Sequence, residues 1–124
     1  MSIATMSARV HALTPPDELI GSLTKERVEL AVRYAGAQSL EGTEEARHWL
    51  GYALGTDVPA VTFAGLAQAF ENREQLEECD LEFWYDLAHT EANLAAMKAK
   101  ADCNIDYCVR HLTAILCTQL GVTA

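Results

Sequence analysis

The chain of 124 residues has few glycines and prolines, and from Leu66 to Leu120 it has neither. These residues are the strongest breakers of regular structure, and the segment is instead rich in good helix formers such as Ala, Leu, Glu and Lys. As one straight helix it would be about 80 Å long, whereas a domain of this size is only about 35 Å across. The segment therefore folds back at a break made of other residues, or projects as a rod that needs a partner.

Strand-like alternation of apolar and polar residues is also missing from the chain. Half of the residues are apolar and 22% are charged, which is typical of a globular domain. We predict a single all-α domain over residues 1–124, a small bundle of about five helices that ends in a long helical hairpin. Residues 1–16 are expected to be loop or frayed helix, and a first helix starts after Pro15-Pro16.

Positive charge is scarce, because 9 Lys and Arg stand against 18 Asp and Glu and leave a net charge of −9. This balance argues against direct binding of nucleic acid and of anionic membrane surfaces, and it permits a basic protein partner. The segment from Met1 to Leu13 lacks the continuous apolar core of a secretion signal, and the most apolar run, Leu112 to Val122, is too short to span a bilayer. We expect a cytoplasmic protein whose four cysteines are reduced.

Local signals place three further helices. Thr24 is the expected N-cap of a helix to about Ala37, Thr43 caps a second helix, and Thr62 caps a third. Gly55 stands where a left-handed residue would end the second helix. Apolar residues at helical spacing define the buried stripes of these helices, namely Val28, Ala31, Val32 and Ala35, then Trp49, Leu50, Ala53 and Leu54, then Phe63, Leu66, Ala67 and Phe70.

The long run without glycine or proline carries Phe83, Leu94, Ile105 and Leu116 at a spacing of eleven residues, which is typical of a nearly straight helix. The favoured break is Asp102-Cys103-Asn104, because Asp and Asn compete for backbone hydrogen bonds. A second candidate is Asn72-Arg73. We predict helices over 73–101 and 104–120 that form the hairpin.

An acidic block is the most distinctive chemical feature, since residues 71–86 contain seven acids and one base. On a helix its carboxylates repel one another at a spacing of four residues and must face solvent or a partner. A solvated helix face, a docking surface for a basic protein and a divalent-cation site are the three interpretations. The candidate partner-binding residues are Glu74, Glu78, Glu82, Tyr85 and Asp86.

Catalytic and metal-binding patterns are sparse. Glu45 and His48 form one Glu-x-x-His, which di-iron bundles use twice, and Cys108 with His111 supplies two of the four ligands that a structural zinc needs. The chain has no nucleophile elbow and no phosphate-binding loop. We predict no catalytic residue, metal or cofactor, and interpret the cysteines as small buried thiols of the core.

Three functions remain open. The first is a non-enzymatic module that binds a basic protein, and that inhibits it by charge mimicry where the occupied surface normally holds nucleic acid. The second is a structural protein that forms a homodimer through its long C-terminal helices. The third is a metal-dependent helical hydrolase.

Overall fold

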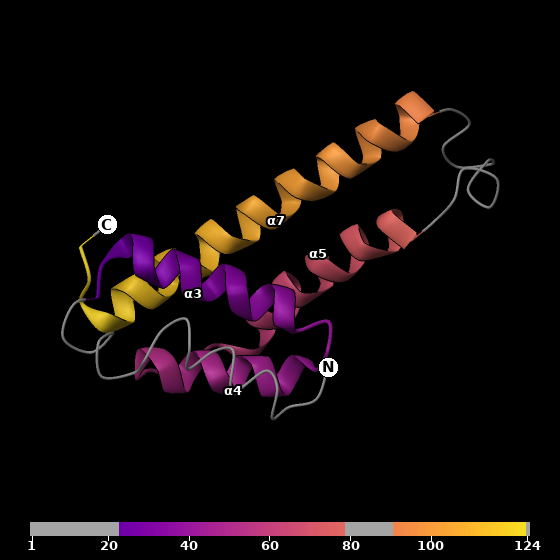
Figure 1. Ribbon diagram of the computed structural model, residues 1–124. Coiled ribbons are helices and arrows are strands. Elements are labelled where there is room, and N and C mark those ends of the chain that lie inside the picture. Colours follow the sequence, from indigo (N-terminus) through magenta and orange to yellow (C-terminus); the bar gives the residue numbers. More distant parts are fainter. Residues whose placement is uncertain (1–22, 79–90, 124) are drawn as a thin grey trace.

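The computed structural model describes residues 23–78 and 91–123 of the chain. These residues form four helices and no strand: α3 (Lys25–Gln38), α4 (Thr43–Leu54), α5 (Ala60–Glu78) and α7 (Glu91–Leu120) (Figure 1). The all-α prediction is confirmed, while the helix expected after Pro16 lies outside the described residues. None of the four helices is long and apolar enough to cross a membrane.

Helix α3 begins as predicted. Thr24 is its N-cap, and the Thr24 hydroxyl accepts a hydrogen bond of 3.2 Å from the Arg27 amide. Helix α4 starts one residue earlier than expected, because the N-cap is Gly42 and Thr43 is already helical. The Gly42 carbonyl accepts the first bond of this helix, from Ala46 at 3.1 Å.

The connection between α4 and α5 is short. Gly55 ends α4 in the left-handed conformation, with a φ of +73°, as predicted. Helix α5 begins at Ala60, so the predicted cap at Thr62 is wrong. The reason lies in Pro59, whose carbonyl accepts the Phe63 amide at 2.9 Å and so starts the helix three residues early.

Both candidate breaks in the long C-terminal run are wrong. Helix α7 is continuous through Asp102-Cys103-Asn104, and α5 is continuous through Asn72-Arg73. The predicted helices over 73–101 and 104–120 therefore have the wrong bounds. Asp102 does not cap a helix, because its carboxylate accepts a hydrogen bond of 2.8 Å from Arg73. The link between α5 and α7 falls in residues 79–90, outside the described residues.

Helices α5 and α7 lie side by side and antiparallel, α3 packs against both, and α4 covers α3 and α5 (Figure 1). The core joins all four helices around fully buried side chains such as Phe63, Leu50, Leu66, Leu112 and Leu116. The last buried residue of α5 is Ala69 and the first of α7 is Ala101. Residues 71–78 and 91–100 therefore form an arm that extends past α3 and α4 (Figure 1).

Candidate functional site

The structure describes two of the five predicted partner-binding residues. Glu74 and Glu78 lie on α5 and are exposed, and Glu71 is exposed on the same helix. Within the described residues none of these three carboxylates makes an ion pair. Glu82, Tyr85 and Asp86 lie in residues 79–90, so their place in the predicted ladder stays a prediction.

Glu74 borders a hollow of about 470 Å³ between α3, α5 and α7. Its apolar part consists of Leu40, which is 44% exposed, the partly buried Phe70 and the buried Ile105. Charged side chains complete the lining, namely Arg33 from α3, Arg73, Glu74 and Glu77 from α5, and Asp102 and Asp106 from α7. The hollow thus combines an apolar floor with a charged rim.

Both arginines of this rim are already paired. Arg73 donates hydrogen bonds of 2.8 Å to Asp102 and to Glu77, and Arg33 forms an ion pair of 3.0 Å with Asp106. The hydrogen bond from Arg73 lowers the pKa of Glu77, as does the nearby charge of Lys98. The hydrogen bonds from Arg73 to Glu77 and Asp102 raise the pKa of Arg73. The two arginines of the rim are therefore already neutralised by acids of the same chain.

A second hollow of about 390 Å³ lies beside the first, at the turn between α3 and α4, and shares Leu40 with it. Glu41 and Glu71 are its acidic residues. We call the two hollows together the acidic groove. Its lining contains two arginines and six acids, a formal charge of −4, and the acids are Glu41, Glu71, Glu74, Glu77, Asp102 and Asp106.

Sequence reasoning missed three of these six acids, because Glu41, Asp102 and Asp106 lie outside the predicted acidic block. Asp102 and Asp106 stand four residues apart, a spacing that puts two side chains on one face of a helix. The predicted break at Asp102 hid this pair, because the pairing requires a helix that continues through Asn104. Glu41 lies in a turn, where no periodic pattern could assign it to a surface.

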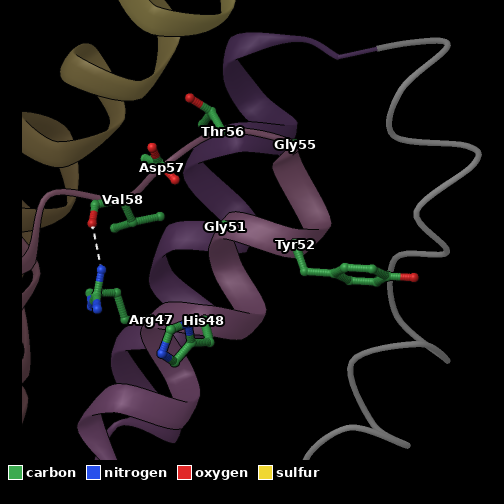
Figure 2. Close-up of a pocket in the computed structure, with 8 residues that line it drawn as sticks. All are labelled: Arg47, His48, Gly51, Tyr52, Gly55, Thr56, Asp57 and Val58. Carbon is green, nitrogen blue, oxygen red and sulfur yellow. Dashed lines mark hydrogen bonds between the residues drawn. The ribbon is translucent and has the colours of Figure 1, made fainter.

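A third hollow of about 580 Å³ lies along α4 and the loop that follows it (Figure 2). Arg47 points toward this loop and donates a hydrogen bond of 3.0 Å to the Val58 carbonyl. Its guanidinium also holds Glu44 at 2.8 Å, which lowers the pKa of Glu44. Gln119 of α7 donates to the Asp57 carbonyl at 2.9 Å. These hydrogen bonds from Arg47 and Gln119 thus hold the loop between α4 and α5 in place.

The sparse metal patterns do not assemble into a larger cluster. No group of three or more His, Cys, Asp and Glu side chains within residues 23–78 and 91–123 could hold a metal ion. His48 lies 3.9 Å from Glu44, and His111 stacks on the ring of Tyr107 with centroids 6.1 Å apart. The described residues therefore lend the metal-dependent hydrolase no support.

Three of the four cysteines lie in the described residues, each in a different environment, and Cys79 lies outside them. Cys117 is buried, Cys108 is partly buried and Cys103 is exposed, so the prediction of buried thiols is wrong for Cys103. Burial raises the pKa of both Cys108 and Cys117, which favours the protonated thiol.

Comparisons with protein-family models, with curated proteins and with solved structures find no match to this chain. The function of the acidic groove is therefore inferred from its own residues.

Proposed function

We propose that the protein is a non-enzymatic binding module whose acidic groove takes a basic segment of another protein. One observation carries this proposal: six acids and two paired arginines line two hollows that share the exposed apolar side chain of Leu40. Such a surface suits Lys and Arg side chains, because their aliphatic stems cover apolar area while their charged ends reach carboxylates.

Electrostatics supports a basic partner in two further ways. The net charge of −9 attracts basic surfaces over a distance and speeds their encounter. Within the groove, Glu71 and Glu74 make no ion pair with the described residues, so their charges are available to cations from a partner. The predicted ladder of Glu78, Glu82 and Asp86, with Tyr85, extends the same proposal along the acidic block.

We further propose that the partner surface normally binds nucleic acid. Surfaces that hold phosphates are rich in Lys and Arg, which are the residues that the acidic groove favours. A protein that occupies such a surface competes with nucleic acid and acts as an inhibitor by charge mimicry.

The test starts with a pull-down of the tagged protein from lysate of the source cells at low salt, and mass spectrometry identifies what it captures. The affinity of the captured protein is then measured for the wild type and for Glu71→Gln/Glu74→Gln. We expect binding at least roughly tenfold weaker for this variant, because two charges of the interface are lost, and competition with nucleic acid by the wild type alone.

The control is Glu26→Gln/Glu91→Gln, which loses the same charge on exposed residues outside the acidic groove. Circular dichroism establishes that both variants keep their helices. Equal weakening in the two variants would show that only net charge matters. Unchanged binding by the Glu71→Gln/Glu74→Gln variant would show that the acidic groove is not the site.

A further inference from the structure

The two hollows of the acidic groove differ in their chemistry. The first, between α3, α5 and α7, has a mostly apolar surface, to which Leu40, Phe70 and Ile105 contribute. The surface of the second, at the turn between α3 and α4, is mostly polar. Leu40 belongs to both linings, so the hollows adjoin. A segment that fills the acidic groove therefore meets an apolar subsite beside a polar one.

The charges of the first hollow largely cancel. Three of its four acids already pair with cations of the same chain, and the contacts are Arg73 with Asp102 and Glu77 at 2.8 Å, Lys98 with Glu77 at 3.5 Å and Arg33 with Asp106 at 3.0 Å. A cation that entered this hollow would lose its hydration without a free carboxylate at each position, which is costly. The hollow therefore favours an apolar side chain over a cation.

Two acids at the edge of the apolar subsite remain for cations. Glu74 borders the first hollow, and Glu71 borders the second. Both are exposed, and neither makes an ion pair with the described residues. Phe70 stands four residues before Glu74, a spacing that puts the two side chains on one side of α5. The apolar subsite and these carboxylates are thus adjacent.

The first hollow is large enough for a bulky side chain and is formed before binding. Its volume of about 470 Å³ lies in the range of small-molecule pockets, so a Leu or Phe side chain fits without rearrangement. Phe70 packs against the core, and its ring lies so close to Gly36 that a Cβ there would overlap it. A wall that is fixed in advance lowers the entropy cost of binding.

We propose that the basic segment bound by the acidic groove carries a large apolar side chain between its cations. This side chain occupies the first hollow beside Leu40 and Phe70, and the flanking Lys or Arg side chains reach Glu71 and Glu74. The inference rests on the proposed function and narrows the class of partner. A segment of cations alone leaves the apolar subsite empty and binds more weakly.

The test uses two fluorescent peptides of equal charge, Gly-Lys-Lys-Phe-Lys-Lys-Gly and the same peptide with Ser in place of Phe. Fluorescence anisotropy at low salt measures the Kd of each for the full chain. We expect the Phe peptide to bind at least roughly tenfold more tightly, because its side chain leaves water for an apolar hollow. Leu40→Ser should reduce this preference to about threefold or less and leave the Kd of the Ser peptide unchanged.

The matched control is Leu30→Ser, which changes a leucine of α3 that is 61% exposed and lies outside both hollows. It should keep the preference of the wild type, and circular dichroism establishes that both variants keep their helices. Equal binding of the two peptides by the wild type would overturn the inference and leave the proposed function intact. The same holds for a preference that survives Leu40→Ser, or one that is lost equally in both variants.

The Glu71→Gln/Glu74→Gln variant separates this inference from the proposed function. It should weaken the binding of both peptides by a similar factor, so that the preference for Phe is kept. If the variant binds both peptides as tightly as the wild type does, the proposed function fails and this inference fails with it. A wild type that binds neither peptide at millimolar concentration has the same meaning.

Discussion

Two glycines of this fold have opposite surroundings. Gly36 is buried on α3, and a Cβ there would overlap the ring of Phe70 and lie 3.1 Å from Leu66 Cδ2. A Cβ at Gly65 on α5 would meet no atom of the described residues within 4 Å. The first glycine allows α3 and α5 to approach each other, whereas the second has no such role within the described part of the chain.

A pair of substitutions separates these roles. Gly65→Ala should stabilise the monomeric chain by about 0.5–1 kcal/mol, the difference in helix propensity. Gly36→Ala should destabilise it by about 1 kcal/mol or more, because the added methyl forces Phe70 and Leu66 to move. Urea unfolding at low protein concentration measures both. A stabilised Gly36→Ala variant would contradict the close packing of α3 on α5.

At the scale of the element, α7 is the longest helix in the described part of the chain, and it passes through Asp102-Cys103-Asn104. Asn104→Pro should cost about 3 kcal/mol or more, since proline removes a backbone hydrogen bond and clashes with the preceding turn. The variant should lose helicity by circular dichroism and unfold at lower urea concentration. If residue 104 instead began a helix, as the sequence suggested, proline would be tolerated there.

Lys25→Pro is the control for this substitution. Lys25 follows the N-cap Thr24 as the first residue of α3, and proline is favoured at that position because no helical carbonyl requires its amide hydrogen. The control should unfold within about 1 kcal/mol of the wild type. A large loss of stability in both variants would show that Asn104→Pro does not report specifically on the continuity of α7.

The helices illustrate what could be predicted from the sequence. Thr24 and Gly55 act through atoms within four residues, and both predictions are confirmed. The break at Asp102 was wrong because its carboxylate bonds Arg73, 29 residues away, and because Ile105 and Val109 are buried. Contacts between distant residues override local preference in such a helix.

The candidate site, like the helices, could be predicted only where it depends on residues close together in the sequence. The exposure of Glu74 and Glu78 could be predicted, since acids four residues apart on a helix repel one another and must face solvent or a partner. The acidic groove could not, because Glu41 and Asp106 join it only when the α3–α4 turn and α7 pack against α5. The position of Leu40 between the two hollows likewise depends on tertiary packing and could not be predicted.

At the scale of the whole molecule, ion pairs link stability to pH. Hydrogen bonds from Arg47 and Arg73 lower the pKa of Glu44 and Glu77 from the usual 4.5. Carboxyls with a lowered pKa stabilise the folded state above their unfolded pKa, and this contribution is lost as the pH falls through their folded pKa. The midpoint of thermal unfolding should therefore decrease below about pH 4.5.

A variant isolates this effect from the general change in charge. Glu77→Gln should melt below the wild type at neutral pH, and the difference should shrink as the pH falls from about 7 to 3. Glu74→Gln is the control, because Glu74 makes no ion pair with the described residues. A Glu77→Gln difference that stays constant over this range would rule out the linkage.

The arm has a consequence for how the fold opens. Its two helical segments carry no fully buried residue, and the partly buried Lys98 forms an ion pair of 3.5 Å with the exposed Glu77 between them. Opening the arm therefore exposes little apolar surface, whereas opening α7 around Val109 and Leu112 disrupts the core. One continuous helix thus spans two regimes of hydrogen exchange, with amides that exchange through local fluctuations at one end and through global unfolding at the other.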